Sequence, residues 1–318
     1  MSKIAFLFPG QGSQVVGMGI DFYEHSSQAR EIFAQADEIL GFNLSRLCFE
    51  GPEEELKLTE ITQPALLTLS FIAHTLLGIV PQIAAGHSLG EYSALVAADS
   101  LSFKDALPLV HKRGKYMQEA VPVGVGAMAA ILGASHQEVE AGIAEVKQGV
   151  VDIANWNSQQ QIVIAGHKEA VQEALKVIDP PRSVVLPVSA PFHSRLMKTA
   201  EEKLVHDLDQ TEFRALKFPI VTNVDAKIIH QGSQAREALK RQVSRPVLWY
   251  ESMERLKGEN IDLFVELGSG KVLSGLAKRI GRDWSSPLTT LNVENSETLN
   301  ESREALSGIL RGKKESKF

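Results

Sequence analysis

The sequence predicts an α/β protein built around a parallel β-sheet, with a smaller α+β unit inserted into it. Short runs of consecutive apolar residues, such as Ile4–Phe8, are typical of strands that are buried on both faces. These runs alternate with longer stretches in which apolar residues recur at helical spacing. The middle of the chain follows a different order, strand-helix-strand-strand-helix-strand, which indicates a separate small unit.

The composition is that of an ordinary globular protein and excludes several classes. The 318 residues, 44% of them hydrophobic, suffice for one large core or two domains. A net charge of −6 argues against nucleic-acid binding. The single cysteine, Cys48, excludes an internal disulfide framework, and no Cys-x-x-Cys or His-Glu-x-x-His pattern predicts a metal site. No run approaches the ~20 apolar residues of a membrane span, so we expect a cytoplasmic protein without membrane contact.

The first strand, Ile4–Phe8, leads into a glycine-rich loop over residues 9–14. A dinucleotide-binding reading of this loop fails, because Val15 holds the third glycine position of the Gly-x-Gly-x-x-Gly pattern. We expect instead a loop whose backbone approaches a ligand closely, with Gln11 at its tip.

Three helical stretches follow the first loop. Residues 21–50 carry apolar side chains at spacings of three, four and seven, and Gly51-Pro52 interrupts them. Three glutamates from Glu53 to Glu55 suit the first turn of a second helix. The sequence Thr62-Gln63-Pro64 predicts the start of a long apolar helix over residues 65–77.

A nucleophile-elbow pattern comes next. The apolar residues 83–85 predict a buried strand, Gly86-His87-Ser88-Leu89-Gly90 predicts a sharp turn, and residues 91–98 predict a helix. In such a turn the serine Oγ stands clear of the backbone, at the positive end of the following helix. This pattern makes the large unit α/β-hydrolase-like. The alternative is a glycine- and serine-rich turn without chemistry.

The small unit follows a helix predicted over residues 102–120. Strands at 128–132, 150–155, 161–165 and 183–188, with helices at 135–146 and 168–178, give a ferredoxin-like order. Its second element begins with a capping box, Ser135-x-x-Glu138. We expect an inserted ferredoxin-like subdomain over residues 124–188, within a discontinuous catalytic domain over residues 1–123 and 189–318.

The remaining chain returns to the large unit. We expect a helix ending near Leu208, a strand over residues 218–222, a helix over 236–243 and a strand over 261–267. A serine nucleophile needs a base within hydrogen-bond reach. Among nine histidines, His193 is the better candidate, because it follows a strand end and a Pro-Phe turn. His87 adjoins Ser88 on the turn, so we expect its side chain to point away from the serine and to have an orienting or packing role.

Six motifs in one order carry a family resemblance. They are Pro9-Gly10-Gln11-Gly12-Ser13-Gln14, Gly86-His87-Ser88-Leu89-Gly90-Glu91, Arg113-Gly114-x-x-Met117-Gln118, Phe192-His193-Ser194, Thr222-Asn223-Val224-Asp225 and Glu266-Leu267-Gly268-x-Gly270-Lys271. The chain resembles the malonyl-CoA:acyl carrier protein transacylase family of type II fatty-acid synthesis over nearly its whole length. The resemblance implies malonyl transfer from malonyl-CoA to acyl carrier protein by a ping-pong route.

The resemblance also implies roles for individual residues. Ser88 would carry the acyl group as an ester, and His193 would take and return its proton. Gln242 matches the position whose main-chain carbonyl orients the histidine. The backbone N–H groups of Gln11 and Leu89 would form the oxyanion hole.

Arg113 would select the substrate, because its guanidinium can bind the free carboxylate of malonyl through two parallel hydrogen bonds. Without the resemblance, Arg113 reads as a solvated charge on a helix. Phe192 would fill the space of a methylmalonyl branch, and Met117 would also bind substrate. Gln63 would line the pocket, its alternative being a role at the helix N-terminus.

The resemblance implies no cofactor or metal, since coenzyme A enters as part of the substrate, and we expect a monomer. The carrier protein is acidic as a class, so docking needs a local basic patch, for which the alternative is a solvated helix face. The candidate residues are Lys271, Lys278, Arg279 and Arg282. Two rival functions remain: a serine esterase or thioesterase that uses water as acceptor, and a non-catalytic acyl-binding module. Fatty-acid and polyketide synthesis are not distinguished.

Overall fold

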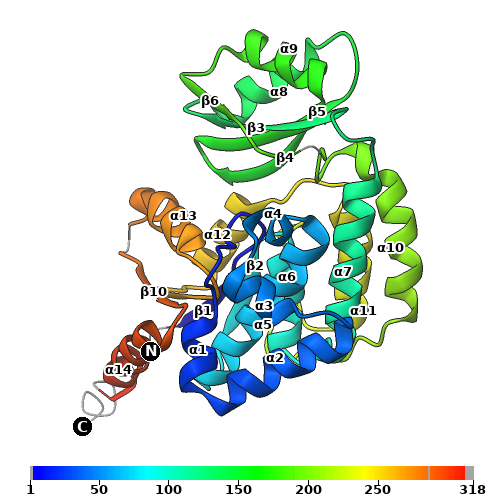
Figure 1. Ribbon diagram of the computed structural model, residues 1–318. Coiled ribbons are helices and arrows are strands. Elements are labelled where there is room, and N and C mark those ends of the chain that lie inside the picture. The colour runs from blue at the N-terminus through cyan, green and yellow to red at the C-terminus, as the bar shows by residue number, and fades with distance from the viewer. Residues whose placement is uncertain (1–2, 189, 286, 312–318) are drawn as a thin grey trace.

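The larger part of the protein is a mixed six-stranded sheet between two layers of helices (Figure 1). The computed structural model describes residues 3–188, 190–285 and 287–311. The strand order is β10 (Thr289–Val293), β9 (Leu263–Leu267), β1 (Ile4–Phe8), β2 (Ile83–Gly86), β7 (Ile220–Val221) and β8 (Ile228–Ile229). All neighbours pair in parallel except β7 and β8. The expected parallel sheet is confirmed, with one antiparallel strand added at its edge.

Strand β1 is buried on both faces, as its uninterrupted apolar run predicts. Phe6 and Phe8 join the larger hydrophobic core, whereas Ala5 and Leu7 join a second core on the opposite face. The larger core is covered by α2 (Ser27–Leu40), α5 (Thr59–Leu77), α6 (Leu89–Ala97), α7 (Phe103–Glu119) and α10 (Lys198–Gln210). The second core is covered by α12 (Trp249–Gly258) and α13 (Val272–Ile280).

The shorter elements complete the large unit, some with corrected bounds. They are α1 (Ile20–His25), α3 (Leu44–Glu50), α4 (Glu53–Leu56), η1 (Arg195–Met197), α11 (Gly232–Gln242), η2 (Gly281–Asp283) and α14 (Ser296–Arg311). The stretch 21–50, expected to be helical throughout, is divided into three helices. Ser26 caps α2 with its side chain, and Gly41 ends α2 in the left-handed conformation.

Helix α5 begins six residues earlier than the sequence predicts. It starts at Thr59 and contains Pro64, which lacks the N–H that would bond the carbonyl of Glu60. The Nδ1 of His111, on the neighbouring helix α7, lies 2.8 Å from that carbonyl oxygen and hydrogen-bonds to it. A partner from another helix therefore compensates for the proline, and this could not be anticipated from local sequence.

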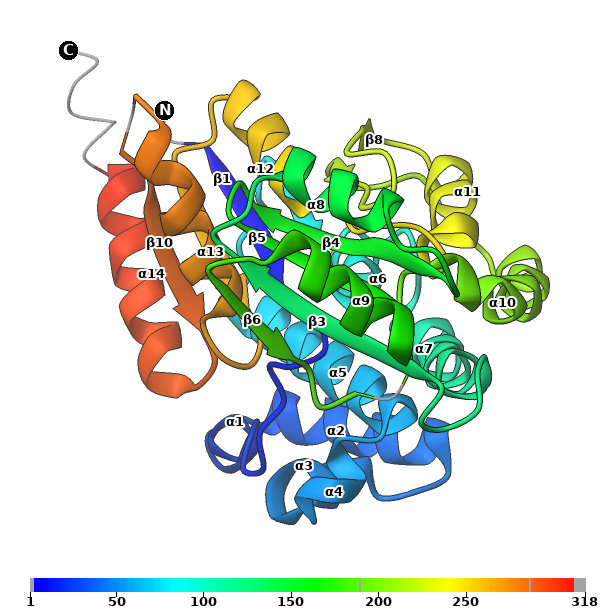
Figure 2. The same ribbon diagram turned by 90° about the horizontal axis from the view of Figure 1, so that it is seen from above.

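The small unit is a four-stranded antiparallel sheet with two helices on its outer face (Figure 2). The sheet order is β4 (Val151–Ser158), β5 (Gln161–His167), β3 (Gly126–Leu132) and β6 (Arg182–Val185), and the helices are α8 (His136–Ala144) and α9 (Lys168–Ile178). This is the predicted ferredoxin-like arrangement, and the capping box of Ser135 and Glu138 is present. The hairpin turn between β4 and β5 is only two residues, because β4 extends to Ser158 instead of ending at the expected Asn155.

Several contacts join the small unit to the large one beside the elbow. Strand β4 exchanges main-chain hydrogen bonds with Val247, through the carbonyl of Ala154 and the N–H of Trp156. The carboxylate of Asp152 on β4 forms an ion pair with Arg195 and accepts from its backbone N–H at 2.9 Å. The predicted border at Ser189 lies outside the described residues. No helix in the described ranges is long and apolar enough to cross a bilayer.

Candidate active site

The turn between β2 and α6 holds Ser88 in a strained conformation. Its φ and ψ are 52° and −104°, a combination that residues with side chains rarely adopt. The flanking glycines are required by close approach of the backbone. A Cβ on Gly86 would lie 1.9 Å from the backbone of Gly90, and one on Gly90 would lie 1.9 Å from the carbonyl oxygen of Phe8. The turn is therefore seated directly against strand β1.

The side chain of Asn223 fastens this turn from the other side. Its Oδ1 accepts from the N–H of Ser88 at 2.7 Å, and its Nδ2 donates to the carbonyl of Gly86 at 2.7 Å. Asn223 follows the short strand β7, which lies next to β2. Sequence reasoning assigned it no role, although a polar residue directly after a buried strand at the edge that carries the elbow is the signal for one.

Ser88 and His193, 105 residues apart in sequence, are hydrogen-bonded in the structure. The Oγ of Ser88 lies 2.7 Å from Nε2 of His193, and Nδ1 of His193 lies 2.9 Å from the carbonyl oxygen of Gln242. Two effects lower the pKa of His193 to about 3: burial is the larger, and the nearby charge of Arg113 is the second. The imidazole is thus neutral at neutral pH and able to accept a proton.

Arg113 reaches the serine from helix α7 and is almost completely buried. Its Nη2 donates to Ser88 Oγ at 3.1 Å and to the side-chain Oε1 of Gln242 at 2.8 Å, and its Nη1 donates to Oε1 of Gln63 at 2.8 Å. Its guanidinium carbon lies 5.3 Å from the centre of the Tyr92 ring. The reading of Arg113 as a solvated helix charge is wrong, because the side chain is 1% exposed.

Glu91 is a second charged residue in the interior of the site, and sequence reasoning gave it no role. It is fully buried on α6, three residues after Ser88. Its Oε2 accepts from Nε2 of Gln242 at 2.7 Å and from the N–H of Asn223 at 3.0 Å. Burial raises the pKa of Glu91 to about 7. A glutamate in a predominantly apolar helix was the feature of the sequence that could have indicated this role.

A cavity of about 430 Å³ opens onto Ser88, and eight of the nine predicted site residues line it. These are Gln11, Gln63, Ser88, Leu89, Arg113, Met117, Phe192 and His193. The ninth, Gln242, lies behind the cavity wall and is joined to it through its hydrogen bonds. The glycine-rich loop closes against the elbow, since a Cβ on Gly10 would lie 2.4 Å from the carbonyl oxygen of His87.

His87 itself points away from Ser88. Its Nε2 lies 2.8 Å from Oδ1 of Asn157 on strand β4, and its ring packs against Trp249. The predicted packing role of His87 thus agrees with its contacts, which join the elbow to the small unit.

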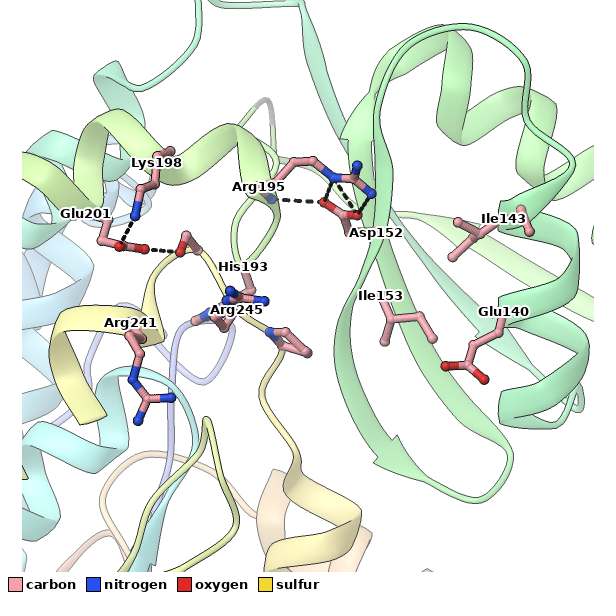
Figure 3. A pocket seen from close by; sticks show the side chains of 13 residues that line it. Glu140, Ile143, Asp152, Ile153, His193, Arg195, Lys198, Glu201, Arg241 and Arg245 are labelled. Atoms are coloured by element: carbon pink, nitrogen blue, oxygen red, sulfur yellow. Dashed lines mark hydrogen bonds and ion pairs between the residues drawn. The ribbon is translucent and has the colours of Figure 1, made fainter. Parts of the chain in front are cut away.

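A larger cavity of about 910 Å³ lies on the other side of His193, between the two units (Figure 3). Arg195, Lys198 and Arg241 in its wall form ion pairs with Asp152, Glu201 and Asp225 respectively. Ser88 is not part of this wall, so the smaller cavity is the candidate active site. In the described part of the chain, no cluster of three or more acidic, histidine or cysteine side chains suits a metal ion.

The fold and the serine–histidine pair define an acyl-transferring class, and similarity to known proteins agrees. The acyl transferase domain family matches residues 5–289, so the chain belongs to this family and is an acyltransferase. The malonyl CoA-acyl carrier protein transacylase of Bacillus subtilis (strain 168) is 47% identical over 307 residues, which cover 94% of this chain and 96% of that protein. The enzyme of that name from Escherichia coli (strain K12) is 47% identical over 288 residues, covering 88% and 93%. The chain belongs to the malonyl CoA-acyl carrier protein transacylase family.

Solved structures are similar over the same length. The malonyl CoA-acyl carrier protein transacylase of Coxiella burnetii superposes with a TM-score of 0.92 at 40% identity, covering 95% of this chain and 97% of that one. A malonyl-transacylase in complex with its type II polyketide synthase acyl-carrier protein superposes with a TM-score of 0.92 at 42% identity, covering 96% and 100%. The expected α/β-hydrolase-like and ferredoxin-like architecture is therefore shared with proteins of this family.

Proposed function

We propose that the protein transfers the malonyl group of malonyl-CoA to the phosphopantetheine thiol of an acyl carrier protein, through a malonyl ester on Ser88, and so supplies malonyl units for fatty-acid chain elongation. One observation carries this: the buried guanidinium of Arg113 lies 3.1 Å from the Oγ of Ser88. A carboxylate bound by that guanidinium would belong to the same small acyl group that the serine attacks.

The reaction is an exchange between two thioesters with an ester between them. Ser88 Oγ attacks the thioester carbonyl carbon of malonyl-CoA while its proton passes to Nε2 of His193. The C–S bond then breaks, and the coenzyme A sulfur leaves with the proton that His193 returns. The carrier thiol repeats these steps in reverse, and Ser88 recovers its hydroxyl proton. In each half-reaction the proton that leaves one reacting group reaches the other through His193, so no proton is gained from or lost to solvent.

The oxyanion of each tetrahedral intermediate would be stabilised by the backbone N–H groups of Gln11 and Leu89. Both residues line the cavity at Ser88. Leu89 begins helix α6, so its N–H lies at the positive end of that helix. The close packing of Gly10 on the elbow supports a rigid loop at this position.

Arg113 would bind the malonyl carboxylate in place of its present contact with Ser88 Oγ. An acetyl group brings no carboxylate and would leave this buried cation without an anion. Gln63 keeps the guanidinium in place, and Met117 lies within 3.7 Å of the Gln63 amide nitrogen. Phe192 would restrict a methylmalonyl branch beside His193.

The carrier protein would dock around helix α13. Leu273 and Leu276 of this helix line the active-site cavity, and Arg279 hydrogen-bonds to Gln161, another lining residue. Lys278 and Arg279 lie on this helix, Lys271 directly precedes it and Arg282 follows in η2, so the four basic residues lie on and beside an element that borders the cavity. We also propose that the protein acts in the cytoplasm as a monomer and that no cofactor takes part.

Intact-mass measurement after brief mixing with malonyl-CoA, acetyl-CoA or methylmalonyl-CoA tests this function. We expect a malonyl adduct on the native protein, no adduct on Ser88→Ala, and a shift of Arg113→Ala toward acetyl. Addition of acyl carrier protein should move the adduct to the carrier. Rapid release of free malonate with no transfer would indicate a thioesterase, and absence of any adduct would indicate a binding module.

A further inference from the structure

Arg113 is a buried cation whose hydrogen-bond acceptors are all neutral. They are the side-chain oxygens of Gln63, Ser88 and Gln242. No ion pair to Arg113 occurs within the part of the chain that the structure describes. Because a buried charge is costly without an opposite charge, a counter-charge is expected nearby.

The buried carboxyl of Glu91 lies one side chain away from Arg113. The amide of Gln242 stands between them: Oε1 accepts from Arg113 Nη2 at 2.8 Å, and Nε2 donates to Glu91 Oε2 at 2.7 Å. The other oxygen of Glu91, Oε1, has no hydrogen-bond partner among the described residues. The carboxyl is thus held by its neighbours but not neutralised by a direct ion pair.

This arrangement fixes the orientation of the Gln242 amide. Flipping the amide would place its NH₂ group against the guanidinium and its oxygen against the carboxylate, so that like groups would face each other. The same NH₂ group donates to the carbonyl of Ser88 at 3.0 Å, and the main-chain carbonyl of Gln242 accepts from His193. Glu91 therefore contacts Gln242. Gln242 in turn contacts the nucleophile Ser88, the base His193 and the substrate-binding Arg113.

We propose that Glu91 is a positioning residue: as the counter-charge of Arg113, it acts through the Gln242 amide to hold the guanidinium in place and to set how strongly it attracts the substrate carboxylate. This inference rests on the proposed malonyl transfer. A direct Glu91–Arg113 ion pair would occupy N–H groups that the substrate needs. The interposed amide keeps the charges close while leaving those N–H groups to the ligand.

The sign of the charge effect follows from Coulomb's law. A bound malonyl carboxylate brings a second negative charge near Glu91, so ionised Glu91 weakens malonyl binding and protonated Glu91 does not. Since burial raises the pKa of Glu91 to about 7, the change falls between pH 6 and 8. The other charged or titratable groups around Glu91 are Arg113 on α7, Tyr92 on α6, His193, and Asp225 after β7, which pairs with Arg241 on α11.

The test uses Ser88→Ala protein, which cannot form the ester, so that binding is measured at equilibrium. The affinity ratio of malonyl-CoA to acetyl-CoA isolates the contribution of the carboxylate, because the nucleotide part is common to both. We expect this ratio to fall as the pH rises from 6 to 8. Adding Glu91→Gln should raise the ratio at pH 8 by about three- to thirtyfold and remove its pH dependence. An unchanged ratio with an unchanged pH profile would overturn the proposal.

Steady-state kinetics with Ser88 intact separate charge from packing. The Gln side chain at position 91 still offers an oxygen to Gln242, so Glu91→Gln should keep kcat within about threefold. Glu91→Leu removes the acceptor and should lower kcat by about tenfold or more. Equal kcat for both variants would contradict a positioning role. If Glu91→Gln does not fold, the pH dependence of the ratio in Ser88→Ala protein decides alone. Failure of the native protein to form a malonyl ester would overturn the proposed function instead.

Discussion

The carbonyl oxygen of Gln242 lies 2.9 Å from Nδ1 of His193, and this contact fixes the tautomer of the imidazole. A carbonyl oxygen only accepts, so Nδ1 carries the hydrogen and Nε2 presents its lone pair to the hydroxyl of Ser88. The orienting group is neutral, whereas a hydrolase triad uses a carboxylate at this position. Thioester exchange needs less base strength than amide cleavage, which suits a neutral partner.

Removal of His193 should abolish acylation without unfolding the protein. We expect His193→Ala to slow formation of the malonyl ester by about 10³-fold or more, because the serine loses its base. Rapid-quench mass spectrometry measures the rate. His206→Ala, which changes an exposed histidine on α10, is the matched control and should acylate normally. Equal rates for the two variants would remove His193 from the mechanism.

Substitution of Arg113 should exchange one specificity for another. Arg113→Ala deletes the cation that would bind the carboxylate, so kcat/KM for malonyl-CoA should fall by about 10²-fold or more, while acetyl-CoA becomes the better substrate. Competition between the two thioesters, read by intact mass, measures this. Lys112→Ala removes the adjacent, exposed cation and should leave the preference unchanged. A uniform loss with both thioesters would assign Arg113 a structural role only.

Asn223 should support both stability and catalysis. Asn223→Ala would leave the N–H of Ser88 and the carbonyl of Gly86 without their partner, at a cost of about 1–3 kcal/mol in the free energy of unfolding. We also expect a lower acylation rate, because the elbow is no longer fastened. Urea unfolding and the acylation rate measure the two effects. A native-like free energy of unfolding together with a native-like acylation rate for Asn223→Ala would contradict this account.

The lowered pKa of His193 makes stability depend on pH. Because burial keeps His193 neutral down to about pH 3, whereas the unfolded chain protonates it near 6.5, its contribution is complete above 6.5 and is lost as the pH falls toward 3. The contribution of His193 alone to the free energy of unfolding should decrease by about 1 kcal/mol per pH unit in that window. His193→Ala should show a smaller decrease between pH 7 and 5. His74 and His87 also have lowered pKa values, but they affect both proteins alike. Identical slopes would contradict the prediction.

A methyl group on the elbow glycine should displace strand β1. Gly90→Ala would bring its Cβ within 1.9 Å of the carbonyl oxygen of Phe8, so we expect a large loss of stability and no ester formation. Gly258→Ala, at the end of α12, meets no atom within 4 Å and serves as the control. Thermal unfolding measures both variants. A Gly90→Ala protein as stable and active as the control would show that the elbow is not tightly seated.

The sequence predicted the architecture well because its signals are local. Uninterrupted apolar runs identified β1, and the capping box at Ser135 identified the start of α8 within one residue. The predicted ends of helices and strands were wrong where contacts with residues distant in sequence influence them. Helix α5 begins at Thr59 and continues through Pro64, and the carbonyl that Pro64 leaves free is bonded by His111 of another helix. Strand β7 has two residues rather than the expected five, since its pairing with β2 extends over only two positions.

The residues that line the candidate site were predicted from motifs, whereas the buried residues behind them were not. The pattern around Ser88 and the later His193 are visible in the sequence, as is the arginine at position 113. The roles of Glu91 and Asn223 depend on side-chain contacts across 132 residues, and no periodicity or spacing encodes such a contact. The orientation of the Gln242 side chain was likewise beyond reach, although its main-chain position was expected.

The small unit begins and ends at neighbouring points. Strand β3 is its first and β6 its last, and the two pair antiparallel, with Ala129 opposite Val185. The chain therefore leaves the large unit and returns to it at one place, whatever the length of the insertion. The 105-residue separation of Ser88 and His193 in sequence is thus no part of the chemistry. Searches for related sites that require a fixed interval between nucleophile and base will miss homologues whose inserted unit is longer, shorter or absent.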